Sequence, residues 1–381
     1  MIRVVVDWGA FYTGDGGIYR YLDEVLTRLS KRKDFEIEVL GIEPSARAPS
    51  AEGIRQVKRV TPSGAWLADG WLKRRLSSLR KVLETGYREF QLGKGKPALF
   101  HSPFYSASPN EKYPTIVTVY DLIPEKLKAE LPHLDQFREL KRKSIENASW
   151  FIVISEQTKS DLVDLFQVDP SRVGVAYLGV DSSFFSQPSD SFLMDELKQN
   201  SWVGHPYLLY VGGREDHKNF PRFLEAYAQS EVNKKYGLQL VGYDYSEKEK
   251  ELIHRLQIGD RVKLHVKASE SELRCYYQQA KLFVYPSLYE GFGLPPLEAM
   301  ASGCPVAAAN AGSIPEVVGS AAELFDPRSI TSIAGAVERA LDTHRSAELV
   351  ALGTSRVHDF TWDQCADKHA EIYQRAAKAL L

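Results

Sequence analysis

Short runs of apolar, β-branched residues alternate along the chain with segments in which apolar positions recur every three or four residues. The first run, 2–8 ("IRVVVDW"), is almost continuously apolar, which is typical of a strand buried in a parallel sheet. The segment after it places apolar side chains on one face of a helix: Ile18, Tyr21, Leu22, Val25, Leu26 and Leu29. The same alternation recurs at 35–42, 98–103, 115–122, 150–155 and 173–180. These elements predict a doubly wound α/β domain.

A second series of strand-like runs begins after a break in the pattern. It comprises 206–213, 238–244, 261–266, 281–287 and 305–310, and helix-period segments separate the runs. The polar stretch 182–204 lacks the alternation at both ends and is the best linker candidate. We therefore expect two doubly wound domains, each binding ligands at the carboxyl ends of its strands.

Composition narrows the class of protein. At 381 residues, with 44% hydrophobic and 26% charged residues, the chain suits a soluble protein with two domains. No run approaches the roughly 18 apolar residues of a membrane span, and the first residues lack the features of a signal peptide. The net charge of −2 argues against nucleic acid as a partner. Cys275, Cys304 and Cys365 lack C-x-x-C spacing and are expected to be free thiols in a cytoplasmic protein.

Two glycine-rich turns follow the first strands of the two predicted domains. Gly14, Gly16 and Gly17 precede the first helix, and Tyr19 stands where a dinucleotide fingerprint needs its third glycine. The second turn runs from Gly212 through Arg214 and His217 to Lys218. Glycine backbone beside fixed cations suits a diphosphate. The same residues would also be found in an ordinary glycine-rich turn and in a solvated cluster of charges, which are the alternatives.

The segment 288–305 ("LYEGFGLPPLEAMASGCP") follows a predicted strand and leads into a helix. Glu290 lies in the loop, Glu298 lies in the first turns of the helix, and Gly291 and Gly293 expose backbone N–H groups between them. Because each carboxylate can accept two hydroxyl hydrogen bonds, this layout matches a nucleotide sugar, with a diol at each end and phosphates between. A surface glutamate and a helix-dipole glutamate are the alternatives.

With "EGFGLPPLE", the motifs "GGIYRYL", "VISEQTKSDL", "YVGGREDHKN" and "GSIPEVVG" closely resemble the retaining nucleotide-sugar transferases of glycosyltransferase family 4, over essentially the whole chain. The resemblance implies a GT-B fold, an α/β architecture of two Rossmann-like domains facing a central cleft. The implied parts are an acceptor domain (1–185), a donor domain (186–362) and a C-terminal helix (363–381) that packs back toward the first domain.

The resemblance also implies roles for individual residues. Glu290 would bind the transferred sugar and Glu298 the ribose, and Lys218 with Arg214 would hold the diphosphate. His101 would lie near the sugar, although a lone histidine is more often a packed one. The remaining donor-binding positions implied are Gly16, Gly17, Gly213, Phe292, Gly293 and Leu294. Tyr120 and Val266 replace residues common in the family, and Arg214 is displaced by one position.

The expected activity is retaining transfer of a hexose to a glycan or lipid-linked acceptor in polysaccharide or glycolipid synthesis. UDP-hexose, above all UDP-glucose, is favoured over GDP-mannose as the donor. No D-x-D follows a strand of the second domain, so we expect no essential metal and no cofactor beyond the donor substrate. A catalytically degenerate sugar-nucleotide-binding subunit and a nucleotide-sugar epimerase are the alternatives.

The segment 66–96 carries tryptophans and a strong excess of Lys and Arg. It is compatible with peripheral docking at the inner face of an anionic membrane. It is equally compatible with a helix whose apolar side packs on its own domain.

Overall fold

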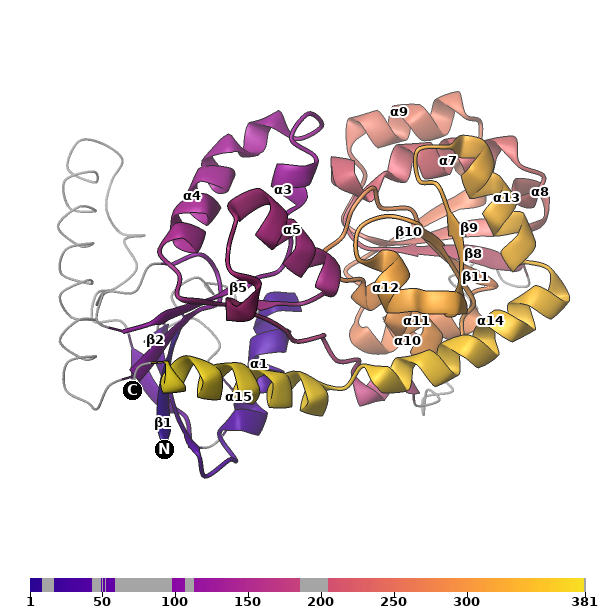
Figure 1. Ribbon diagram of the computed structural model, residues 1–381. Helices are drawn as coiled ribbons and strands as arrows, with labels where there is room; N and C mark the ends of the chain where they lie inside the picture. Colours follow the sequence, from indigo (N-terminus) through magenta and orange to yellow (C-terminus); the bar gives the residue numbers. More distant parts are fainter. Residues whose placement is uncertain are drawn as a thin grey trace.

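The computed structural model describes residues 1–8, 17–42, 49, 51, 53–58, 98–106, 113–185 and 205–379. Of the predicted linker 182–204, residues 182–185 form a short 3-10 helix, and 186–204 lie outside this part of the chain, as do the segment 66–96 and Gly16. Two parallel sheets dominate the described residues, and Figure 1 shows them as the centres of two neighbouring α/β domains. The predicted fold class is confirmed.

The N-terminal sheet has the order β3-β2-β1-β4-β5-β6-β7, with every neighbouring pair parallel. Its strands are β1 (Ile2–Asp7), β2 (Phe35–Ile42), β3 (Arg55–Lys58), β4 (Ala98–Ser102), β5 (Thr115–Val119), β6 (Trp150–Val153) and β7 (Val173–Val175). The predicted strand 173–180 is shorter than expected. The polar edge strand β3 was not predicted.

The C-terminal sheet has the order β10-β9-β8-β11-β12-β13 and is also parallel. Its strands are β8 (Tyr207–Val211), β9 (Gly237–Gly242), β10 (Val262–Val266), β11 (Leu282–Tyr285), β12 (Val306–Ala309) and β13 (Ala322–Phe325). In both sheets the chain starts in the middle, winds to one edge and then returns to build the other side. This Rossmann order creates a topological switch point, where loops at the carboxyl ends of adjacent strands diverge and leave a crevice.

Helices cover both faces of each sheet. Those of the N-terminal domain are α1 (Gly17–Leu29), α3 (Ile123–Lys126), α4 (Asp135–Glu146) and α5 (Glu156–Phe166). Those that follow β8 are α7 (Phe220–Gln229), α8 (Val232–Lys235), α9 (Glu247–Arg255), α10 (Glu270–Gln279), α11 (Leu294–Ala301), α12 (Ile314–Val318), α13 (Ile330–Ala340), α14 (Thr343–Arg356) and α15 (Trp362–Lys378). None of the described helices is long and apolar enough to cross a membrane.

Alternating strand residues feed different cores, as the period of two requires. Ile116 and Ile152 join the core under α1 and α15, whereas Val117 and Phe151 join a second core with residues of α4 and α5. Helix α15 leaves the C-terminal domain after α14 and runs back beneath the N-terminal sheet, as Figure 1 shows. The expected return of the last helix to the first domain is therefore present.

Candidate active site

The candidate site lies at the switch point of the C-terminal sheet, between the loops that follow β8 and β11. These strands are neighbours, with Leu209 aligned with Phe283. The loop after β8 contains Gly212 to Lys218, and the loop after β11 contains Pro286 to Gly293. A backbone hydrogen bond of 2.7 Å from Leu288 N to His217 O joins the two loops.

Lys218 and Glu290 form an ion pair across this junction. Lys218 Nζ donates to Glu290 Oε1 at 2.7 Å, and Glu290 is 8% exposed. Burial alone would raise the pKa of Glu290, but Lys218, with smaller contributions from Ser287 and His217, outweighs it and holds the pKa below its usual value. A buried, charged carboxylate is thus fixed beside a cation at the carboxyl ends of β8 and β11. Sequence reasoning selected both residues, and the structure brings them together.

The backbone around Glu290 is held from behind by Ser313. The Ser313 hydroxyl donates to the carbonyl oxygens of Glu290 (3.0 Å) and Phe292 (2.8 Å). Gly293, at φ = 131°, then turns the chain into α11, a conformation that L side chains rarely adopt. Leu294 is the first residue of α11, and prolines follow it as predicted. The N–H groups at this helix start suit an anionic or polar ligand.

The N-terminal domain touches the same loop. A Cβ on Gly291 would lie 2.0 Å from the carbonyl oxygen of Tyr120, so only a glycine permits this approach. A second contact joins the domains: Glu316 of α12, in the C-terminal domain, accepts hydrogen bonds from two N–H groups at the start of α5, those of Glu156 (2.7 Å) and Gln157 (3.0 Å). The two domains are therefore in direct contact around the candidate site.

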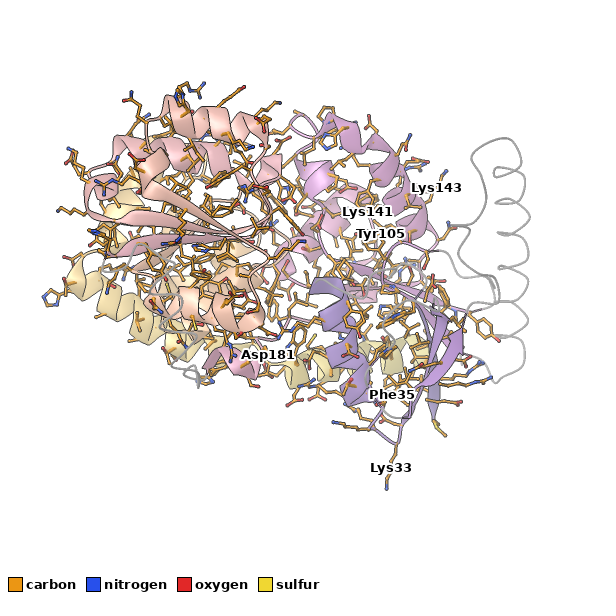
Figure 2. The ribbon with its side chains drawn as sticks, turned by 180° about the vertical axis from the view of Figure 1, so that it is seen from behind. Lys33, Phe35, Tyr105, Lys141, Lys143 and Asp181 are labelled. Carbon is orange, nitrogen blue, oxygen red and sulfur yellow. The ribbon has the colours of Figure 1, made fainter. Side chains whose placement is uncertain are left out.

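Glu298 is half-buried in α11 near the domain junction. Burial raises the pKa of Glu298 to about 7, against the opposing effects of Arg20 and the Tyr277 hydroxyl. Tyr277 donates to Glu298 Oε2 at 3.3 Å. Arg20, from α1, forms ion pairs with Asp181 and with Glu270 (3.0 Å); Figure 2 labels Asp181 where the two domains meet.

Sequence reasoning missed Arg20, although it lies within the quoted motif "GGIYRYL". Its position one helical turn after Gly17 was the available signal, because side chains three residues apart share one face of a helix. Its partners on both domains are distant in sequence and could not be found from spacing.

The structure does not bring His101 into the candidate site. His101 lies within β4 and is 0% exposed. Its Nε2 contacts the Thr118 hydroxyl at 2.8 Å, and its Nδ1 contacts the Tyr373 hydroxyl of α15 at 2.8 Å. Burial lowers its pKa to about 3. Because both ring nitrogens have partners inside the core, His101 is a packing residue of the α15 interface, and we do not keep it in the proposed site.

Arg214 is likewise engaged elsewhere. Its guanidinium pairs with Glu249 at 2.5 Å and donates to the carbonyl oxygens of Tyr243 (2.6 Å) and Asp244 (2.7 Å). The side chain is only 5% exposed. These contacts fix the loop between β9 and α9, and Lys218 is the cation that the structure places beside Glu290.

Of the remaining predicted positions, Gly213 and Phe292 lie in the two loops, and Gly17 lies in the N-terminal domain. Gly17 is the first residue of α1, and Gly213 accepts a hydrogen bond from the Tyr210 hydroxyl at 2.6 Å through its carbonyl oxygen. The Phe292 ring packs on Tyr177 and Phe360, so only its backbone is available to a ligand. Within the described residues, no cluster of His, Cys, Asp or Glu could hold a metal ion. Metal independence stays a prediction.

Two parallel sheets in Rossmann order, with a partly buried acid–cation pair at the switch point of the second sheet, define a GT-B glycosyltransferase architecture. The profile of glycosyl transferases group 1 matches residues 195–351, and that of glycosyltransferase family 4 matches 15–184. The chain belongs to this family of glycosyltransferases.

Individual relatives agree with this assignment. O-antigen chain mannosyltransferase B of Escherichia coli is 28% identical, with 94% of this chain and 96% of the relative covered. An MMP alpha-(1->4)-mannosyltransferase of Mycolicibacterium hassiacum is 31% identical over 63% of this chain and 57% of its own length. A D-inositol 3-phosphate glycosyltransferase of Xylanimonas cellulosilytica is 27% identical, with 96% and 93% covered. Sucrose-phosphate synthase of Thermosynechococcus elongatus has the same fold, with a TM-score of 0.77, 21% identity and full coverage of both chains.

Proposed function

We propose that the protein is a retaining, metal-independent hexosyltransferase that moves mannose from GDP-mannose to a glycan acceptor in polysaccharide synthesis. The observation that carries the transferase site is the ion pair between half-buried Lys218 and buried Glu290 beside the N-terminus of α11. The mannosyl donor replaces the UDP-glucose favoured from the sequence. It is supported by the names of relatives, of which the Escherichia coli mannosyltransferase matches nearly end to end.

In this proposal, the two ends of the donor bind to the two glutamates. The Glu290 carboxylate accepts hydrogen bonds from hydroxyls of the transferred sugar, and the Lys218 ammonium faces the diphosphate. Glu298 accepts the ribose hydroxyls. The N–H groups at Gly293 and Leu294 add fixed dipoles where the leaving diphosphate gains negative charge, which is the main contribution to catalysis.

The reaction then proceeds on one face of the sugar. The bond between C1 and the phosphate oxygen breaks, the acceptor oxygen bonds to C1, and the acceptor proton passes to the departing phosphate oxygen. Glu290 orients the sugar and forms no covalent bond with it. Contact between the domains at Gly291 and Tyr120 limits the access of water, which would otherwise compete with the acceptor.

The test compares GDP-mannose with UDP-glucose by thermal unfolding and by nucleotide release. GDP-mannose at about 100 times its dissociation constant should stabilise the protein by roughly 2.7 kcal/mol. Glu290→Gln should retain stabilisation by GDP but slow nucleotide release at least about a hundredfold. As a control, Glu338→Gln makes the same change at an exposed position on α13 and should match wild type. Product NMR should give the donor's anomeric configuration.

Each alternative predicts a different result. Stabilisation and turnover with UDP-glucose alone would overturn the mannosyl donor but keep the site. Stabilisation without any turnover of donor would favour the degenerate subunit, and failure of every nucleotide to bind would overturn the site itself.

A further inference from the structure

A cavity of about 590 Å³ lies between the two domains, next to the candidate donor site. On the N-terminal side its wall is formed by the segment from Asp121 through α3 to the start of α4. On the C-terminal side it is formed by Glu215, Asp216 and His217. The cavity is thus bounded by the loop that carries Lys218, and a molecule in it would lie beside the donor site.

His217 connects this cavity with the donor site. It precedes Lys218 in the chain and also lines the cavity. Burial lowers its pKa, while the negative charges of Glu290 and Asp121 act on it in the opposite direction. The Glu290 carboxylate belongs to the donor site, and Asp121 belongs to the cavity wall.

Apart from His133 and His217, the described residues of the wall are acidic or apolar. Its carboxylates are Asp121, Glu215 and Asp216, and its apolar side chains include Leu131, Leu134 and Phe137. No lysine or arginine is among the described residues that line it. Carboxylates accept hydrogen bonds from hydroxyl groups, and apolar side chains cover the C–H face of a sugar ring.

The cations behind the wall are committed to structural contacts. Arg138 donates to the carbonyl oxygens of Pro124 (2.9 Å) and Leu131 (3.0 Å), which holds the wall segment together. Lys141 is fully buried, donates to the carbonyl oxygen of Asp121 and the carboxylate of Glu125 (3.0 Å each), and lies beside Tyr105, as Figure 2 shows. Neither cation lines the cavity to receive a phosphate.

We propose that this cavity binds an uncharged sugar unit of the acceptor and that its carboxylates exclude phosphorylated acceptors. The proposal rests on the transferase function proposed above and specifies its second substrate. Asp121 and Asp216 would accept acceptor hydroxyls from opposite domains, with Phe137 and Leu134 beneath the ring. An anionic acceptor such as an inositol phosphate would be repelled at the same place, so specificity arises partly from an unfavourable contact.

The experiment measures binding and transfer separately. With GDP bound, ligand-observed NMR would be used on methyl glycosides of mannose, glucose, galactose and N-acetylglucosamine and on their 6-phosphates. At least one neutral glycoside should bind at least about tenfold more tightly than its 6-phosphate, because like charges placed together oppose binding. The same order should appear in kcat/KM when GDP-mannose is the donor.

Charge reversal at Asp216, an exposed position, identifies the cavity as the source of this preference. Asp216→Lys should raise the ratio of phosphorylated to neutral binding about tenfold, whereas Asp260→Lys, an equal change on the exposed turn before β10, should leave it unaltered. Equal or tighter binding of the phosphorylated glycosides by wild type, no binding of any neutral glycoside, or an unchanged ratio in Asp216→Lys would each overturn the proposal. GDP stabilisation of the same samples reports on the donor site independently.

Discussion

Replacement of Lys218 by alanine would leave the Glu290 carboxylate buried without its cation. In the folded wild type the pKa of Glu290 is lowered, so the pair adds stability above the ordinary glutamate value, which is lost as pH falls through the folded pKa. In Lys218→Ala the main opposing charge is gone, and burial, opposed only by Ser287 and His217, should raise that pKa. A carboxyl whose pKa is higher in the folded than in the unfolded protein adds stability at low pH, and this stability is lost as the pH rises. The Lys218→Ala variant should therefore be least stable near neutral pH.

The magnitude follows from the proton that Glu290 can take up. Removal of one partner from a buried pair costs about 3–5 kcal/mol. The buried carboxyl can avoid a larger cost by taking up a proton. Holding a glutamic acid protonated costs about 1.4 kcal/mol for each pH unit above its ordinary pKa, so the limit at pH 7 is about 3.4 kcal/mol. At pH 5 the same limit is about 0.7 kcal/mol. The penalty of Lys218→Ala should therefore grow by up to about 2.7 kcal/mol between pH 5 and pH 7.

Urea unfolding at both pH values, followed by circular dichroism, measures this difference. The double variant Lys218→Ala with Glu290→Gln should lose the pH dependence. Lys234→Ala removes an ion pair of the same 2.7 Å length with Glu231, but both side chains are more than two-thirds exposed, so its effect should be small at either pH. An equal penalty for Lys218→Ala at pH 5 and pH 7 would refute the buried-pair argument.

Three further predictions concern Glu298, the carboxylate proposed to bind the ribose, and the contacts between the two domains. Because the pKa of Glu298 is about 7, GDP affinity measured by calorimetry should rise about tenfold from pH 6 to pH 8 in wild type and be nearly flat in Glu298→Gln; the same slope in both would exclude Glu298 as the titrating group. Gly291→Ala should push the Tyr120 carbonyl away and increase the radius of gyration in X-ray scattering, with at least about tenfold slower nucleotide release; wild-type dimensions and rate would show that the contact is dispensable. Glu316→Gln should weaken the charged cap of α5 by about 1 kcal/mol and speed proteolysis between the domains, and no change would argue against an interdomain clamp.

Much of the fold could be predicted because its signals are local. Buried parallel strands are apolar runs, and the strand–loop–helix order around Glu290 and Glu298 follows from residues within one short segment. Strand β3 escaped because "RQVK" at a sheet edge is polar and lacks such a run.

The predicted site residues that the structure does not place beside Glu290 have partners far away in the sequence. His101 meets Tyr373 across 272 positions, and no spacing rule reveals that both of its nitrogens are occupied. Arg214 meets Glu249 only because the chain folds back through β9. For the same reason the sequence did not reveal the role of Arg20, whose partners are Asp181 and Glu270.

The position of α15 has a consequence for biosynthesis. Its buried side chains complete the face of the N-terminal sheet beside α1, through contacts such as Tyr21 with His369 at 2.5 Å and Tyr373 with His101. A ribosome makes residues 362–378 only after the whole donor domain has been made. Domains commonly fold in the order of their synthesis, yet here the first domain keeps an uncovered apolar face until translation has passed the second. A premature stop codon before Trp362 would therefore damage the domain at the opposite end of the chain.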